Sequence, residues 1–148
     1  MRLSVIIPSR NGGALLARHL PEIVRQAAAL PGGAEVLIVD DLSDHAGDDT
    51  VAVVAAAGPI AQLLRSNIHR GFAGTCNLGA QQARGEFLLF LNNDMRLEQD
   101  CLQRLVALLT VRQDLFAISP TIVNAAQRFV ESTTRFVWRR GAIDLYFP

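Results

Sequence analysis

The sequence contains no lysine, and arginine supplies all fourteen of its Lys and Arg side chains. Three kinds of site depend on a lysine: the phosphate-binding P-loop, the Schiff base of pyridoxal enzymes and the late lysine of phosphorelay receivers. The missing lysine therefore argues against all three. A GxGxxG fingerprint is also missing, which argues against a dinucleotide-dependent oxidoreductase.

Cysteine and long apolar runs are scarce as well. Cys76 and Cys101 form no CxxC pair, so we expect two buried free thiols in a reducing compartment. No stretch approaches the ~20 apolar residues of a membrane span, and the run after Met1 is too short for a signal peptide. The net charge is zero, so no overall field attracts nucleic acid or anionic lipid. These absences predict a cytoplasmic protein with no nucleic-acid partner and no transmembrane segment.

What the chain does have is apolar surface to bury. Its 148 residues suit one domain, and half of them are apolar, which excludes disorder. Short apolar runs predict strands at residues 3–7, 36–39, 60–64, 87–91 and 116–119. Helical spacing predicts helices at 14–30, 75–84 and 97–112, and a further short element covers 51–57.

This alternation predicts an α/β fold with three layers, a mostly parallel sheet covered by helices on both faces. Four of the strands read as continuous apolar runs, so we expect them to be buried on both faces. Pro21 predicts a kink or a break in the first helix. Residues 128–148 show no clear period, and nothing in the chain suggests a second domain.

In such sheets, ligands bind beyond the carboxyl ends of the strands. The residues that follow the four strands are therefore the candidate binding residues. They are Pro8-Ser9-Arg10-Asn11, Asp40-Asp41-Leu42-Ser43-Asp44, Ser66-Asn67 with His69-Arg70-Gly71-Phe72, and Asn92-Asn93-Asp94. Acids, amides and arginines would then face one crevice.

Each of these groups is open to two interpretations. Asp94 could hold a hard divalent cation that takes phosphate oxygens as further ligands, or it could cap a helix in a simple turn. Asp41 could accept hydrogen bonds from a nucleobase or a ribose, or cap the next helix. His69 could be a ligand or a hydrogen-bonding loop residue, and Arg70 a phosphate contact or a solvated charge. The glycines of residues 67–79 would let backbone N–H groups approach an anion at a helix start.

Taken in order, four segments resemble the inverting GT-A glycosyltransferases of family 2, especially the rhamnosyltransferase-like branch. They are SVIIPSRN at residues 4–11, VLIVDDLSD at 36–44, the loop at 67–79 and RGEFLLFLNND at 84–94. The resemblance extends to about residue 130. It implies a Rossmann-like GT-A domain over residues 1–148 that binds a nucleotide-diphosphate sugar.

By position, the resemblance implies nine residues that bind the sugar donor. They are Pro8, Ser9, Arg10, Asn11, Asp41, Arg70, Asn77, Asn93 and Asp94. Pro8, Ser9 and Arg10 would line the base and ribose pocket, with the guanidinium plane stacking on the base. Asp41 would contact the nucleobase and Asn93 would lie near the ribose. Arg70 and Asn77 would lie close to the nucleotide, and Asp94 would hold Mn²⁺ or Mg²⁺ on the diphosphate.

The same resemblance implies an acceptor segment that carries a general base, an aspartate or glutamate. Glu131 and Asp144 lie in the wrong segment for it, so we expect 1–148 to be the sugar-donor-binding half and to transfer nothing alone. The acceptor would be a saccharide or a lipid-linked one, as in cell-surface polysaccharide biosynthesis at the inner membrane face. The aromatic residues at 136–138 and 146–147 could be a surface bared by truncation, a contact with a second copy, or a membrane-proximal patch.

Three other functions remain open from the sequence. The first is a nucleotide-sugar-binding module without catalysis. The second is a phosphorelay receiver, suggested by the acidic pair Asp40-Asp41 and opposed by the missing lysine. The third is a sugar-phosphate nucleotidylyltransferase, which would need a basic glycine-rich loop that residues 9–13 do not supply.

Overall fold

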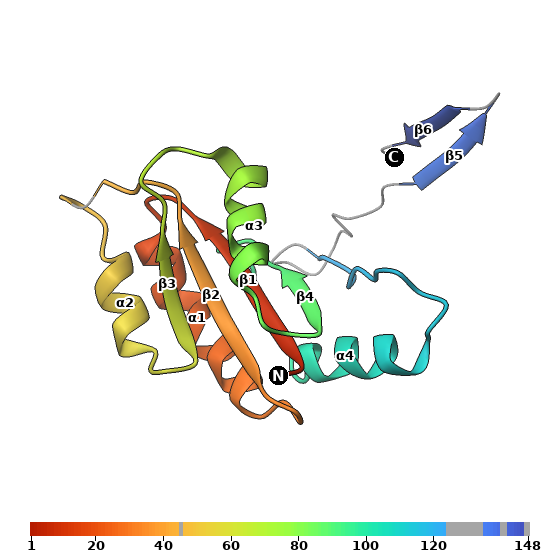
Figure 1. Cartoon of the computed structure of the whole chain (residues 1–148), viewed down its shortest axis with the longest axis horizontal. Coiled ribbons are helices and arrows are strands. Elements are labelled where there is room, and N and C mark those ends of the chain that lie inside the picture. Colours follow the sequence, from red (N-terminus) through yellow and green to blue (C-terminus); the bar gives the residue numbers. More distant parts are fainter. Residues whose placement is uncertain (45, 124–134, 140–141, 147–148) are drawn as a thin grey trace. The chain divides into compact units, whose positions relative to one another are not determined.

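The computed structural model describes residues 1–44, 46–123, 135–139 and 142–146 (Figure 1). The chain divides into two compact units, Met1–Arg112 and Gln113–Pro148. Within the described ranges, no helix is both long and apolar enough to cross a membrane.

The first unit is built on a parallel sheet with the strand order β3-β2-β1-β4. The central strand β1 (Leu3–Ser9) pairs with β2 (Ala34–Asp40) on one side and with β4 (Phe87–Phe90) on the other. β3 (Ala61–Arg65) pairs with the outer side of β2. Since every pairing is parallel, the four carboxyl ends lie along one edge of the sheet.

Helices cover both faces of this sheet (Figure 1). On one face, α1 (Gly13–Ala28), α2 (Thr50–Ala56) and α4 (Cys101–Val111) share a core with β1 and β2. That core includes Leu3, Val5, Ile7, Leu16, Leu20, Ile23, Val36, Ile38, Val54, Leu102 and Val106. On the opposite face, α3 (Gly71–Gln82) packs on a smaller cluster of Ile6, Leu37 and Val39. The predicted three-layer arrangement is confirmed.

The strand at 87–91 was expected to be buried on both faces, and this is wrong. β4 directs Phe87, Leu89 and Leu91 into the larger core, whereas Leu88 and Phe90 are 43% and 49% exposed. The reason is position: β4 forms one of the two edges of the four-stranded sheet, and α3 packs over β1 and β2. A composition as apolar as that of a central strand does not reveal which strand lies at an edge.

The helices differ from expectation mainly at their ends. α1 continues through Pro21 as one helix, so the predicted break does not occur. α3 begins at Gly71, whose φ of +68° suits a residue without a side chain, and not at residue 75. Within α3, a Cβ on Gly79 would lie 2.5 Å from Ile6 Cγ2, so this glycine lets the helix approach the sheet closely.

In the second unit, the predicted strand at 116–119 is wrong. Residues 116–119 follow an irregular path, and Phe116 is fully exposed. A four-residue apolar run becomes a strand only where a neighbour supplies hydrogen bonds. The unit instead contains an antiparallel hairpin of β5 (Arg135–Arg139) and β6 (Ala142–Tyr146), which the sequence did not indicate. The aromatic surface expected at 136–138 and 146–147 concerns side chains outside those that the structure describes.

Candidate functional site

Three strand ends meet at the carboxyl edge of the sheet. The Asp41 N–H donates to the Ser9 carbonyl at 2.8 Å, and the Leu91 N–H donates to the Ile6 carbonyl at 3.0 Å. The loops after β1, β2 and β4 therefore begin side by side. This places the predicted segments 8–11, 40–44 and 92–94 at one edge.

The ends of β1 and β4 are joined by side chains. Asn93 Nδ2 donates to the buried Ser9 hydroxyl at 3.0 Å. Gly12 lies against this pair, and a Cβ there would come within 2.3 Å of both Asn93 Nδ2 and Ser9 Oγ. Asp94 follows Asn93 and is exposed, as a residue that meets a ligand must be. Pro8, one residue before Ser9, is half-buried.

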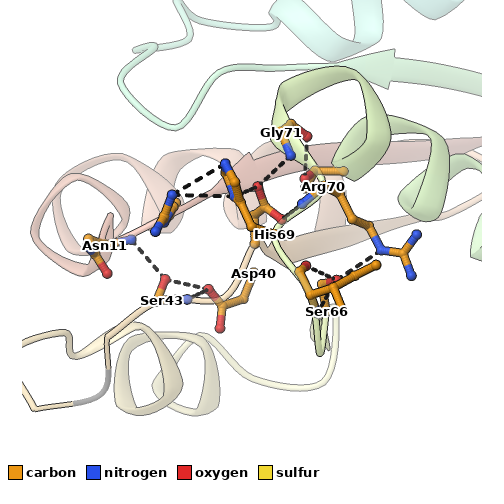
Figure 2. Close-up of polar contacts among 11 residues, drawn as sticks. Asn11, Asp40, Ser43, Ser66, His69, Arg70 and Gly71 are labelled. Carbon is orange, nitrogen blue, oxygen red and sulfur yellow. Dashed lines mark hydrogen bonds and ion pairs between the residues drawn. The ribbon is translucent and has the colours of Figure 1, made fainter.

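Asn11 holds the loop that follows β2 (Figure 2). Its backbone N–H donates to Ser43 Oγ at 2.8 Å. Its side-chain oxygen accepts from the Asp44 N–H, also at 2.8 Å. The Ser43 hydroxyl in turn donates to the buried Asp40 carboxylate, which also pairs with Arg65 Nε at 3.7 Å. Asn11 has a φ of +50°, a conformation that asparagine tolerates better than most residues. Asn11 thus shapes the edge of the site from within the protein.

Asp41 is the most heavily engaged residue at this edge. It is 5% exposed and accepts hydrogen bonds from the Arg70 N–H at 2.6 Å and the Gly71 N–H at 2.9 Å. His69 Nδ1 lies 2.8 Å from its Oδ2. Burial alone would raise the pKa of Asp41, but these three donors together hold that pKa below its usual value.

The backbone N–H groups at the start of α3 are therefore already paired with an anion of the protein itself. The glycine-rich segment was expected to bring backbone N–H groups to a bound anion, and the anion that the Arg70 and Gly71 N–H groups meet is the Asp41 carboxylate. A carboxylate has about four acceptor positions, and three donors occupy Asp41. The predicted contact with a nucleobase would have to use the acceptor capacity that remains on the Asp41 carboxylate.

His69 joins Asp41 to the end of β1. Arg10 Nη1 lies 3.4 Å from both ring nitrogens of His69, which links the loop after β1 to the start of α3. His69 is thus a hydrogen-bonding loop residue, one of the two interpretations left open by the sequence. Its connection to Arg10 could not be found in the sequence, because the two residues are neighbours only through the packing of α3 on the sheet.

The two remaining predicted residues belong to α3 and its entry. Arg70 is exposed, and its Nε donates to Ser66 Oγ at 2.9 Å, next to the end of β3 (Figure 2). Asn77 is exposed in the second turn of α3. The roles of both toward a nucleotide remain predictions.

Metal binding at this edge would depend on the ligand. Within the described part of the chain, no group of three or more acidic, histidine or cysteine side chains could hold an ion. Mg²⁺ commonly binds through one or two carboxylates and takes water and phosphate oxygens for the rest. The exposed Asp94 beside Asn93 fits that pattern, because a diphosphate would complete the set.

The cysteines take no part in the site. Cys76 is buried in α3, Cys101 is half-buried in α4, and both are free, as expected. Burial raises the pKa of both thiols, although Arg104 opposes this at Cys101. A raised pKa disfavours the nucleophilic thiolate.

Comparison with known proteins points to one family. The family described as "Glycosyl transferase family 2" matches residues 4–146. An uncharacterized glycosyltransferase of Haemophilus influenzae is 33% identical over 92 residues, which cover 62% of this chain and 29% of that protein. A GalNAc(5)-diNAcBac-PP-undecaprenol beta-1,3-glucosyltransferase of Campylobacter jejuni is 33% identical over 109 residues, 71% of this chain and 33% of that protein. This chain spans about a third of the length of these relatives.

Solved structures give the same answer. S. aureus TarS 1-349 in complex with UDP-GlcNAc has a TM-score of 0.65 and 25% identity over 76% of this chain and 32% of that one. The mannosyltransferase PcManGT from Pyrobaculum calidifontis, in complex with GDP-Man and Mn²⁺, has a TM-score of 0.63 and 26% identity over 73% of this chain and 32% of that one. With a family match over almost all of its residues and the parallel sheet of these transferases, this chain belongs to glycosyl transferase family 2.

Proposed function

We propose that this chain binds the sugar donor of a glycosyltransferase. The complete reaction would move a sugar from a nucleoside diphosphate to an acceptor hydroxyl, with inversion at the anomeric carbon. The observation that carries the proposal is the hydrogen bond between Ser9 and Asn93, which joins the carboxyl ends of β1 and β4. Arg10 and Asp94 are the next residues after this pair in the sequence. The UDP-GlcNAc and GDP-Man bound to TarS and PcManGT support a nucleotide sugar as the ligand.

The arrangement supports a direction for the nucleotide along this edge. The base would lie toward Arg10, on the side of β2 and α3, and the ribose would lie beside Pro8, Ser9 and Asn93. The diphosphate would then reach Asp94 after β4. Arg70 and Asn77 would border the nucleotide from α3, and Asn11 would keep the loop after β2 in place.

A divalent cation, Mn²⁺ or Mg²⁺, is part of this proposal. Asp94 would hold it together with oxygens of the diphosphate. When bound, such a cation stabilises the negative charge that grows on the leaving diphosphate. The bond from Asn93 to the buried Ser9 fixes the residue before Asp94, so the carboxylate starts from a defined backbone position. The Mn²⁺ bound in PcManGT supports the choice of metal.

A complete transfer also needs an acceptor site and a general base, and we propose that residues 1–148 do not contain that base. An inverting transfer needs a carboxylate that removes the acceptor proton, and from the sequence neither Glu131 nor Asp144 is well placed for it. The name of the Campylobacter jejuni relative supports a lipid-linked saccharide as the acceptor and a role in building a surface glycan. Membership of the rhamnosyltransferase-like branch is proposed from the sequence motifs alone.

The second candidate is a nucleotide-sugar-binding module without transfer activity, which is favoured by the sequence positions of Glu131 and Asp144, since both lie outside the segment expected to carry a general base. Both candidates require metal-dependent binding of a nucleoside diphosphate. Calorimetric titration with UDP, GDP and ADP, in Mn²⁺ and again in excess chelator, tests this property. We expect one diphosphate to bind in Mn²⁺ and to lose most of its affinity in chelator. Equal affinity in chelator would contradict the metal, and no binding of any nucleotide would contradict both candidates. A radiolabelled-sugar transfer assay then separates them, because turnover by 1–148 would require a base within this chain.

A further inference from the structure

Asp41 fixes the orientation of the His69 ring. The carboxylate is itself immobile, because the Arg70 and Gly71 N–H groups hold its two oxygens from the first turn of α3. An ionised carboxylate only accepts hydrogen bonds, so His69 Nδ1, 2.8 Å from Oδ2, carries the hydrogen. The ring is thereby tied to the sheet edge although half of the His69 side chain is exposed.

Arg10 lies over the face of this ring. Its Nη1 is 3.4 Å from Nδ1 and 3.4 Å from Nε2. An atom equidistant from the two nitrogens in the plane of the ring would collide with Cε1, so the guanidinium nitrogen lies above the plane. A guanidinium group on the face of an aromatic ring is a contact to which arginine is better suited than lysine.

Asp41 contacts His69, and His69 contacts Arg10, so the three residues lead from the core to the surface. Asp41 is buried, His69 is partly exposed, and Arg10 is exposed at the end of β1. A free arginine side chain samples many rotamers, and a ligand that needs one of them must first immobilise it. The contact with the His69 ring would restrict the Arg10 side chain before any ligand arrives.

We propose that His69 is a positioning residue, which holds the Arg10 guanidinium in place for the base end of a nucleotide. This rests on the proposed function for the ligand, but the contact itself is a property of the free protein. In this proposal Asp41 orients His69 and the start of α3, and Arg10 makes the contact with the base that depends on His69.

The first test needs no ligand. The side-chain Nε–Hε signal of Arg10, assigned through its loss in Arg10→Ala, reports fast motion through its heteronuclear NOE. We expect a high NOE in the wild-type chain and a clear fall in His69→Ala, with an unchanged value in the control Arg18→Ala, an exposed arginine on α1. Thermal unfolding of the same samples verifies that His69→Ala is folded. An unchanged Arg10 NOE in folded His69→Ala would overturn the inference.

The second test measures UDP, GDP and ADP affinity in Mn²⁺. Freezing one flexible side chain corresponds to about a five-fold change in dissociation constant, so we expect His69→Ala to weaken binding by about that factor. The double variant Arg10→Ala/His69→Ala should bind no more weakly than Arg10→Ala alone, because His69 acts through Arg10. Additive losses, or an unchanged affinity in His69→Ala, would overturn the inference and leave the proposed function intact. If the wild-type chain binds no nucleotide, the proposed function is wrong, and so is the role of His69 toward a nucleotide, even where the first test shows that His69 restrains Arg10.

Discussion

Asn93 and Ser9 tie the carboxyl end of β4 to that of β1 through a 3.0 Å hydrogen bond, in which the Asn93 amide donates to a buried hydroxyl. The bond crosses the two loops that carry the predicted ribose and metal residues. It leaves the Asn93 side-chain oxygen able to accept from a ligand. The position of Asp94, one residue further, depends on this contact.

Gly12 is the residue whose replacement should disturb that contact most directly. A Cβ at this position would lie 2.3 Å from both Asn93 Nδ2 and Ser9 Oγ. Overpacking of this kind costs about 1–3 kcal/mol, and here it pushes Asn93 away from β1. We expect Gly12→Ala to lower the unfolding temperature and to weaken nucleoside diphosphate binding.

Gly47→Ala is the matched control for Gly12→Ala. No atom lies within 4 Å of the position that its Cβ would take, so the added methyl group meets open space. Differential scanning fluorimetry and calorimetry of both variants check the pair. Equal behaviour of the two alanines would show that the loop after β4 can move without loss.

Asp94 should carry the metal dependence of nucleotide binding. Asp94→Asn removes the charge that a divalent cation requires and keeps the size of the side chain. We therefore expect the affinity for nucleoside diphosphate in Mn²⁺ to fall to the level measured in chelator. Asp49→Asn, at an exposed aspartate whose side chain makes no capping bond to α2, should retain the wild-type difference. If Asp94→Asn still responds to Mn²⁺, another residue must hold the metal.

The sequence was sufficient for the layers of the fold but not for its edges. The buried strands β1 and β2 were visible as apolar runs, since both of their faces are covered. β4 has the same composition and lies at the edge of the sheet, and no local pattern distinguishes the two situations. The pairing of β5 with β6 was not visible in the sequence, because residues 128–148 as a whole show no clear period.

The candidate site divides in the same way. The meeting of residues 8–11, 40–44 and 92–94 followed from the rule that parallel strands end at one edge. The partners of Asp41 did not follow, because they depend on where α3 begins and how closely Gly79 lets it approach β1. The sequence offered ligand binding and capping of the next helix as alternatives for Asp41. Its contacts with Arg70 and Gly71 are capping contacts, but they are made to α3 and not to α2, the next helix in the chain.

Glu35 gives a prediction for acid stability at the opposite end of the sheet. Its carboxylate is 2% exposed and accepts bonds from Ser4 Oγ, the Arg84 N–H and the Arg84 guanidinium. Burial opposes ionisation, but these donors outweigh it and lower the pKa of Glu35 below the ordinary 4.5. As the pH falls, the unfolded chain takes up this proton first. The stabilisation from Glu35 is therefore complete above pH 4.5 and is lost as the pH drops toward its folded pKa.

Glu35→Gln should separate this contribution from the rest. A bond to a charged group contributes about 1.5–3 kcal/mol, of which solvent around the exposed Arg84 side chain screens part. We expect a lower unfolding temperature at pH 7 and a smaller difference from wild type at pH 3. Glu98→Gln, which removes an exposed pair with Arg96, should change neither value appreciably. A constant difference from pH 7 to pH 3 would contradict the role assigned to the Glu35 charge.

Gln26 should hold α4 against α1. Its buried side chain accepts from the Leu102 N–H at 3.1 Å and donates to the Glu98 carbonyl at 2.8 Å, which satisfies backbone groups at the start of α4. Asp100, at the cap position, makes no side-chain bond to the helix, so a residue of another helix supplies the cap.

Gln26→Ala leaves the buried Leu102 N–H without its partner, at a cost of about 1–3 kcal/mol, whereas the Glu98 carbonyl still accepts from the Cys101 N–H. We expect the unfolding temperature to fall and amide exchange to accelerate in the first turn of α4 more than in α3. Gln103→Ala, on the exposed side of α4, is the matched control and should leave both measurements near wild type. Exchange that accelerates equally in α3 and α4 would mean that Gln26 stabilises the whole unit and has no particular role at the α4 terminus.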